Sequence, residues 1–419
     1  MIRIQGRHRA ARFLFTAGLV AAAAVVTGAG SASAGTPAAL PTGTILGAGA
    51  GHAIGDSYIV TFSSGAGVAG RVATTSAALA RRYGGSVVDN YTSAVTGFHA
   101  RMSQLQARRL AANPAVRSVE QDARVTADTT TTQAKPTWGL DRIDQEKLPL
   151  SGTYTYRSAA GVTAYVLDTG IRISARDLEG RARNGYDFID NDKVAQDCNG
   201  HGTHVAGTIG GRTYGVAKDV QLVAVRVLDC KGSGSYSAII KGIDWVTRNA
   251  VRPAVANMSL GGGTSKTLND AVKKSIAAGI TYAVAAGNDN QDACKQSPAG
   301  QPDAITVAAT DGADARASFS NFGACVDLFA PGVKITSLSA KSDTGTTMMS
   351  GTSMASPHVA GAAALVLGAY PAYTPKQVRD ALVANASANR VSNRAGAPNQ
   401  LLDTMWLNAA ATVAGKKAR

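Results

Sequence analysis

The stretch VTAYVLDTG, residues 162–170, is a mostly apolar run that ends in a carboxylate, Asp168. Such a run is typical of a strand in a parallel sheet, because helices cover both faces of that sheet. Similar runs follow at 220–228, 254–260, 280–286 and 304–308. Segments with helical periodicity alternate with them at 202–210, 236–249, 267–278, 353–370 and 375–386. The alternation predicts an α/β fold, a doubly wound and mostly parallel sheet with helices on both faces.

A different pattern precedes this region. Short extended segments at 57–62, 86–91, 97–100 and 116–120 enclose helical segments at 72–83 and 103–112. This β-α-β-β-α-β order predicts a small α+β domain of ferredoxin-like type. Residues 35–55 lack periodicity and are predicted to be a linker, whereas the Thr-rich residues 128–135 are predicted to be exposed and cleavable.

The first residues have the features of a secretory signal peptide. Four arginines lead into an uncharged run at 13–26, and small residues follow at Ala32 and Ala34. The run is too short to span a membrane as a helix, although a retained anchor is the alternative. We therefore expect residues 1–34 to be removed on export and the remainder to be secreted and soluble.

Export to an oxidising compartment makes two disulfides the expected state of the cysteines. They are Cys198, Cys230, Cys294 and Cys325, and three pairings are possible. None of them belongs to a C-x-x-C pair, which disfavours a zinc site.

Two further segments carry residues suited to catalysis. In NGHGTHVAGT, residues 199–208, His201 lies at the start of a helix between glycines, and His204 follows three positions later. The H-E-x-x-H pattern of metallopeptidases is absent, so we interpret His204 as a core histidine bonded to backbone. In GTSMASPHVAG, residues 351–361, Ser353 lies at the mouth of a long small-residue helix, where it is either a helix cap or a nucleophile.

The order Asp168, His201, Ser353 differs from that of α/β-hydrolases, in which the serine comes first. This order argues against a lipase or esterase. With the three segments taken together, the chain resembles the subtilisin-like serine peptidases of the proteinase K branch, and most closely their aqualysin-like secreted members. The likeness runs from residue 138 to about residue 402, and the small domain resembles the family's inhibitory prodomain.

The resemblance implies a secreted serine endopeptidase made as a self-processing zymogen. Ser353 would be the nucleophile, His201 the general base and acid, and Asp168 the residue that holds the imidazole. The Asn288 amide and the Ser353 backbone N–H would stabilise the oxyanion. A catalytically dead relative is the alternative, but none of these four residues is replaced.

The resemblance also implies substrate and metal sites. Two segments would flank an extended peptide and a third would close the first specificity pocket: Gly232, Ser233 and Gly234; Ser259, Leu260 and Gly261; Ala285, Ala286 and Gly287. Because these walls are small and lack acidic residues, cleavage is expected after hydrophobic or aromatic residues. Structural calcium would bind the Asp327 carboxylate with the carbonyls of Pro302 and Ala304.

A second calcium site of the aqualysin-like members would begin at Asp141, Asp144 and Gln145, but this chain continues it with Ser151 and Thr153. Another acidic loop is interpreted as a solvated turn; it holds Asp187, Asp190, Asp192 and Asp197.

The predicted organisation is a signal peptide at 1–34, a linker plus prodomain at 35–130, a peptidase domain at 131–405 and a tail at 406–419. Residues 1–130 hold 12 basic and 5 acidic residues, which is half of the net charge of +14. The mature part is only mildly basic, so a nucleic-acid partner is not expected. The expected partners are protein and peptide substrates and the chain's own prodomain, with no membrane partner after signal cleavage and a monomeric state.

Overall fold

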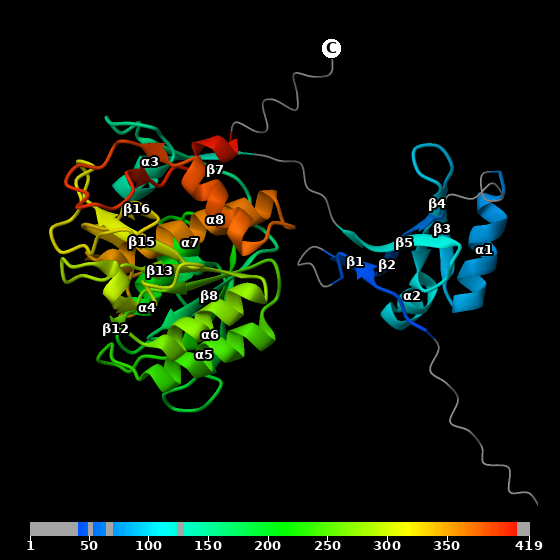
Figure 1. The fold of residues 1–419 in the computed structure, drawn as a ribbon, viewed down its shortest axis with the longest axis horizontal. Coiled ribbons are helices and arrows are strands. Elements are labelled where there is room, and N and C mark those ends of the chain that lie inside the picture. The colour runs from blue at the N-terminus through cyan, green and yellow to red at the C-terminus, as the bar shows by residue number, and fades with distance from the viewer. Residues whose placement is uncertain (1–40, 49–52, 64–69, 124–129, 409–419) are drawn as a thin grey trace, which may run out of the picture. The chain divides into compact units, whose positions relative to one another are not determined.

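The structure is a computed structural model that describes residues 41–48, 53–63, 70–123 and 130–408 (Figure 1). The predicted signal peptide at 1–34 lies outside these residues. Within the described ranges, no helix is both long and apolar enough to cross a membrane.

The small N-terminal domain has a five-stranded sheet with the order β1-β5-β2-β4-β3. Its elements are β1 (Ile45–Leu46), β2 (Ala53–Phe62), α1 (Val72–Tyr83), β3 (Ser86–Tyr91), β4 (Gly97–Arg101), α2 (Gln104–Ala111) and β5 (Val116–Ala123). Val60, Phe98, Leu110 and Val119 are fully buried in its core. The predicted α+β domain is confirmed. The predicted linker is wrong where β1 pairs in parallel with β5, because these residues are part of the sheet.

The large domain is built on a nine-stranded sheet with the order β19-β20-β16-β15-β13-β11-β8-β10-β9. All neighbouring strands are parallel except β19 and β20. In sequence order the strands are β8 (Thr163–Asp168), β9 (Ala182–Asp187), β10 (Gln221–Arg226), β11 (Ala254–Met258), β13 (Ile280–Ala285), β15 (Ile305–Thr310), β16 (Leu328–Pro331), β19 (Ser387–Ala388) and β20 (Gln400–Leu401). The prediction of a mostly parallel sheet is confirmed.

Alternate residues of the central strands face two separate cores. Ala164 and Val166 of β8 pack into a core with α4 (His201–Gly210) and α7 (Thr352–Ala369). Tyr165 and Leu167 pack into a second core with α5 (Tyr236–Asn249) and α6 (Lys266–Ala277). Figure 1 shows α5 and α6 side by side. Helix α8 (Pro375–Ala384) packs beside α7. Helices therefore cover both faces of the sheet, as predicted.

Several short elements were not predicted. Besides β9, β16, β19 and β20 of the large sheet, they include α3 (Trp138–Ile143) and three antiparallel pairs: β6 (Thr131–Ala134) with β7 (Thr153–Tyr156), β12 (Gly262–Gly263) with β14 (Gln296–Ser297), and β17 (Ile335–Leu338) with β18 (Thr346–Met349). Strand β6 comes from the Thr-rich stretch, whose described residues 130–135 are exposed except for the half-buried Gln133 but are not free of regular structure.

The large domain continues past the predicted boundary at residue 405. Leu407 is buried, and its carbonyl accepts a hydrogen bond from Nη1 of Arg157 (2.9 Å). Nδ2 of Asn408 donates to the carbonyl of Thr155 (2.9 Å). Residues 406–408 thus belong to the domain, and the predicted tail boundary is too early.

Candidate active site

The candidate site lies where the order of the sheet changes direction. Strand β8 sits between β10 and β11, so the chain winds outward from it to both sides. Crevices at the carboxyl ends of strands on either side of such a switch are the usual ligand sites of open α/β sheets. Asp168 is the last residue of β8 and therefore lies at this edge.

Asp168 and His201 are joined by a hydrogen bond. Oδ1 of Asp168 lies 2.8 Å from Nδ1 of His201 and also accepts the backbone N–H of Thr169 (2.7 Å). The Asp168 side chain is fully buried, whereas the His201 side chain keeps 24% of its surface exposed. The imidazole of the pair is therefore partly accessible to solvent, whereas the carboxylate is not.

Asp197 holds the start of the helix that carries His201. Its Oδ1 accepts the N–H groups of Asn199 (2.9 Å) and Gly200 (2.8 Å) and the Thr169 hydroxyl (2.9 Å). Its Oδ2 accepts the N–H and the hydroxyl of Thr203, at 2.9 and 2.6 Å. A buried carboxylate at a helix N-terminus satisfies backbone donors that the helix leaves unpaired. Asp197 therefore fixes the entry to α4, a role that the sequence analysis missed.

The surroundings of the two histidines shift their pKa values in opposite directions. Burial lowers the pKa of His201, but the charge and hydrogen bond of Asp168 and the charge of Asp197 outweigh it, so the pKa is raised overall. Burial lowers the pKa of His204 to about 4, and its Nε2 lies 2.9 Å from the carbonyl oxygen of Ile335. His204 is thus a core histidine bonded to backbone, as predicted.

Ser353 lies in the first turn of α7 and lines the same cleft as His201. Its hydroxyl donates to the carbonyl oxygen of Ser259 (3.2 Å), and the Ser259 hydroxyl donates to the Ser353 carbonyl (2.8 Å). Below them, Nδ2 of Asn257 donates to Oγ of Ser259, and Oγ of Ser356 donates to Oδ1 of Asn257. These bonds tie α7 to the end of β11 and fix the position of the Ser353 backbone.

The Asn288 side chain is held by its oxygen. Oδ1 of Asn288 accepts the N–H of Thr352 (2.8 Å) and the Thr352 hydroxyl (3.0 Å). The Asn288 residue is exposed, and the position a Cβ would take on Gly351 lies 3.7 Å from its Nδ2. Because both bonds use the oxygen, the amide N–H₂ group remains the part of Asn288 that can donate to a ligand.

A cleft of about 730 Å³ brings most of the predicted substrate residues together. Gly232, Ser233 and Gly234 line it, as do Ser259, Leu260 and Gly261. His201 and Ser353 lie in the same cleft, and Lys231 and Tyr236 add to its lining. The two segments that the resemblance placed beside a bound peptide therefore share a cavity with the candidate catalytic residues.

The third predicted segment does not line this cleft. Ala285 and Ala286 are buried at the end of β13, and the Gly287 N–H donates to Oγ1 of Thr352 (3.1 Å). Gln296, which the sequence analysis did not name, lies between the predicted walls. Its Oε1 is 2.4 Å from the position that a Cβ would take on Gly287 and 3.7 Å from that on Gly261.

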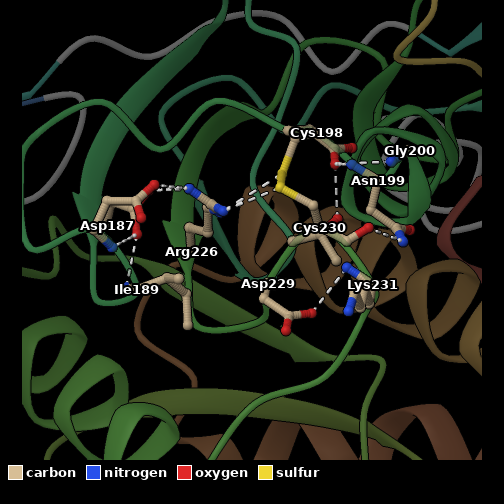
Figure 2. The surroundings of a disulfide bond; sticks show 12 residues. Asp187, Ile189, Cys198, Asn199, Gly200, Arg226, Asp229, Cys230 and Lys231 are labelled. Atoms are coloured by element: carbon tan, nitrogen blue, oxygen red, sulfur yellow. Dashed lines mark hydrogen bonds and ion pairs between the residues drawn. A yellow bond between two sulfur atoms is a disulfide. The ribbon is translucent and has the colours of Figure 1, made fainter.

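Both disulfides are formed, as Cys198–Cys230 and Cys294–Cys325. The first joins the loop before His201 to the loop that lines the cleft (Figure 2). Nδ2 of Asn199 also donates to the Cys230 carbonyl (3.0 Å). These links connect the loop before His201 to one wall of the cleft.

The acidic loop is not simply a solvated turn. Nη1 of Arg226 lies 2.6 Å from Oδ2 of Asp187 and 2.6 Å from Oδ2 of Asp190. Its Nη2 donates to Sγ of Cys198 (3.4 Å), a contact drawn as a dashed line in Figure 2. Asp187 is buried, as is Asp197, whereas Asp190 and Asp192 are exposed. The interpretation as a solvated turn is therefore wrong for the two buried residues, which bond inward.

At the expected calcium site, a guanidinium approaches the oxygens that would bind the ion. Nε of Arg379 donates to Oδ1 of Asp327 (2.8 Å), Nη2 donates to the same oxygen, and Nη1 donates to the carbonyl of Pro302 (2.8 Å). Oδ2 of Asp327 accepts the N–H of Thr306 (2.8 Å). Calcium needs six to eight oxygen ligands, and a fixed positive charge on two of the three expected oxygens opposes it. The Ala304 carbonyl is the one expected ligand that Arg379 does not contact. The residues present therefore do not fit calcium here.

At the second expected calcium site, protein donors occupy both oxygens of Asp141. Oδ1 of Asp141 accepts the N–H and hydroxyl of Ser151, at 2.9 and 3.0 Å, and Oδ2 accepts the N–H of Gly152 (2.8 Å). Across the part of the chain that the structure describes, no group of three or more His, Cys, Asp or Glu residues is arranged to hold a metal ion.

Comparisons with known proteins give a family for each of the two domains. Residues 159–400 match the Subtilase family, and residues 57–128 match Peptidase inhibitor I9. The chain is 57% identical over 323 residues to the "Extracellular serine proteinase" of Thermus sp. (strain Rt41A), which covers 76% of this chain and 78% of that relative. It is 42% identical over 410 residues to the "Cuticle-degrading serine protease" of Arthrobotrys oligospora. This match covers 93% of this chain and 98% of that relative.

A solved structure, the "Crystal structure of a cold adapted subtilisin-like serine proteinase", is 54% identical with a TM-score of 0.64 and covers 65% of this chain and 99% of that one. The family match spans the sheet, the candidate site and the helices around them. The chain therefore belongs to the subtilase family of serine endopeptidases and carries an I9 inhibitor prodomain.

Proposed function

We propose that this chain hydrolyses peptide bonds through an acyl-enzyme formed on Ser353, with His201 as general base and acid and Asp168 as its buried partner. The observation that carries the proposal is the 2.8 Å bond between Asp168 and His201, which lie in one site with Ser353 at the switch point of the sheet. The family membership supports the same assignment.

In this proposal, Oγ of Ser353 attacks the carbonyl carbon of the scissile bond and His201 takes up its proton. The Ser353 hydroxyl must first turn from the Ser259 carbonyl toward the imidazole. His201 then passes the proton to the leaving amine, and water repeats the sequence to release the acyl group. Asp168 keeps Nδ1 protonated and stabilises the imidazolium that forms.

The oxyanion of each tetrahedral intermediate needs preorganised donors. We assign this role to the Nδ2 group of Asn288 and the backbone N–H of Ser353. Support comes from Thr352, whose two bonds to Oδ1 leave the amide nitrogen of Asn288 as the available donor. Ser353 adds an N–H from the first turn of α7, where backbone donors have no partner within the helix.

The substrate is proposed to be an extended peptide that lies between segments 232–234 and 259–261. Backbone groups of these segments would pair with it as strands pair in a sheet. The side chain before the scissile bond would enter the space between segments 259–261 and 285–287, with Gln296 beside it. Small, neutral walls favour large hydrophobic or aromatic residues, so broad cleavage after such residues is expected.

The I9 domain is proposed to inhibit the enzyme until self-cleavage removes it. Residues 131–134 are paired with β7, so a cut within them would break that pairing. We therefore place the cut ahead of Thr131, in the first part of the predicted cleavable stretch. Export is supported by the signal-like residues 1–34 and by the name of the Thermus relative, "Extracellular serine proteinase". A monomeric state and the absence of nucleic-acid and membrane partners remain predictions.

The test is N-terminal sequencing of the secreted product from wild type and Ser353→Ala in a peptidase-deficient host. Ser350→Ala, which changes an exposed serine near the nucleophile, is the matched control. Wild type and the control should begin near residue 131, and Ser353→Ala should retain the prodomain. Processing of Ser353→Ala to the same terminus would contradict self-cleavage. Failure of purified wild type to digest casein would contradict the peptidase proposal itself.

A further inference from the structure

Three segments meet at the edge of the sheet opposite the candidate active site. Asp327 directly precedes β16, Pro302 lies in the loop before β15, and Arg379 lies on α8. The guanidinium joins them, with Nε donating to Oδ1 of Asp327 and Nη1 donating to the carbonyl of Pro302, both at 2.8 Å. A metal ion bound to the same oxygens would connect only the first two segments, whereas Arg379 also attaches the helix.

We propose that Arg379 takes the place of a metal ion at this end of the sheet. The Asp327 position then binds no calcium, and the contribution of this position to the stability of the fold does not depend on the calcium concentration. An ion stabilises a fold only to the extent that its free concentration exceeds its dissociation constant. A guanidinium covalently attached to α8 has no such dependence. Its planar fork of donors and permanent charge suit one carboxylate oxygen and a neighbouring carbonyl.

The burial of the group explains why some cation is needed. The Asp327 side chain is only 9% exposed and that of Arg379 is 32% exposed. A buried carboxylate without a partner is costly, and removing one member of a buried ion pair destabilises a protein strongly. The Lys376–Asp380 pair on the same helix offers a contrast, because its side chains are 79% and 56% exposed. Exposed pairs of this kind contribute little.

The test compares thermal unfolding in EDTA and in millimolar calcium chloride. The mature enzyme is first inactivated with a serine-directed sulfonyl fluoride to stop autolysis. Wild type and Asp327→Asn should show the same calcium-dependent shift in Tm, because any shift then arises from calcium bound elsewhere. Arg379→Ala in EDTA should unfold on the order of 5 °C below wild type. The control Lys376→Ala should unfold within about 1 °C of wild type.

Calcium should raise the Tm of Arg379→Ala more than that of wild type, because the freed oxygens can then accept an ion. The double variant Arg379→Ala/Asp327→Asn should lack this extra rise. Arg379→Lys keeps a positive charge with fewer donors, and it serves if Arg379→Ala is not secreted; it should unfold between the two. A calcium-dependent shift in wild type that Asp327→Asn removes would overturn the proposal, as would an Arg379→Ala variant as stable in EDTA as wild type.

Discussion

Asp168 and Asp327 are buried carboxylates at opposite edges of one parallel sheet, and they have similar partners. Asp168 is the last residue of β8, and its carboxylate is hydrogen-bonded to the Thr169 N–H and to His201. Asp327 precedes β16 and bonds the Thr306 N–H and Arg379. The imidazole exchanges a proton near neutral pH, whereas a guanidinium remains charged. In the two proposals, the same arrangement thus serves proton transfer where the partner titrates and structural attachment where it does not.

The largest expected effect follows from removing the charge of Asp168. Asp168→Asn should lower kcat by about 10⁴-fold, because an amide no longer holds the tautomer of His201 that can accept the Ser353 proton. Steady-state hydrolysis of a peptide anilide checks this. The matched control Asp192→Asn changes an exposed acid of the nearby loop and should keep wild-type kcat. A variant that retains a tenth of the wild-type kcat would contradict the role of Asp168.

Loss of the oxyanion donor should come next. Asn288→Ala should lower kcat by about 10²–10³-fold with KM little changed, a magnitude known for the corresponding donor of a related subtilase. Thr352→Val keeps the backbone donor to Asn288 but removes the hydroxyl at 3.0 Å, so it should cost less. An Asn288→Ala effect confined to KM would assign the amide to ground-state binding instead.

A smaller effect is expected from the floor of the proposed specificity pocket. Gln296→Glu places a carboxylate beside Gly287 and Gly261. It should raise kcat/KM for substrates with Lys or Arg before the scissile bond, relative to those with Phe, by about tenfold. Gln291→Glu, an exposed change on the same loop, is the control. An unchanged ratio between the two substrate classes would place Gln296 outside the pocket.

The smallest expected effect is a shift of the pH profile. His201 must be neutral to act as a base, so kcat/KM rises with pH as it loses its proton. Asp197 contributes to the raised pKa of His201. Asp197→Asn keeps one acceptor oxygen for the capping bonds but removes the charge, so the ascending limb should move to lower pH. Asp192→Asn should leave the limb in place, and a shift of the Asp197→Asn limb to higher pH would contradict this account.

Periodicity predicted the elements whose own sequence carries a regular pattern of apolar residues. Helix α5 and strand β3 begin and end at the predicted residues, and β8 lies within the predicted run at 162–170. The elements that were missed lack such a pattern. Strand β9 mixes charged, polar and small residues around Gly185, and β16 is four residues long and ends in Pro331. The sequence of β9 is not an apolar run, whereas β16 is apolar but too short to show a periodic pattern, and both depend on neighbouring strands for their pairing.

The residues of the two sites also differ in whether their local sequence indicates their role. Asp168, His201 and Ser353 were found because each sits in a distinctive local segment. Asp197 was interpreted as solvated, because the donors that surround it could not be seen in a run of acidic residues. Arg379 was not considered, because its partner Asp327 is 52 positions away in the sequence. Charges whose meaning depends on a distant partner therefore required the structure.

The most direct test of the central claim is to identify the residue that a serine-directed sulfonyl fluoride modifies in the mature enzyme. Peptide mapping by mass spectrometry should find one modified serine, Ser353, and caseinolytic activity should fall in proportion to its labelling. Prior conversion of Asp168 to Asn should slow the labelling strongly, because the nucleophile is then not activated. Modification of another residue, or full activity in completely labelled enzyme, would contradict the assignment of Ser353 and His201 to catalysis.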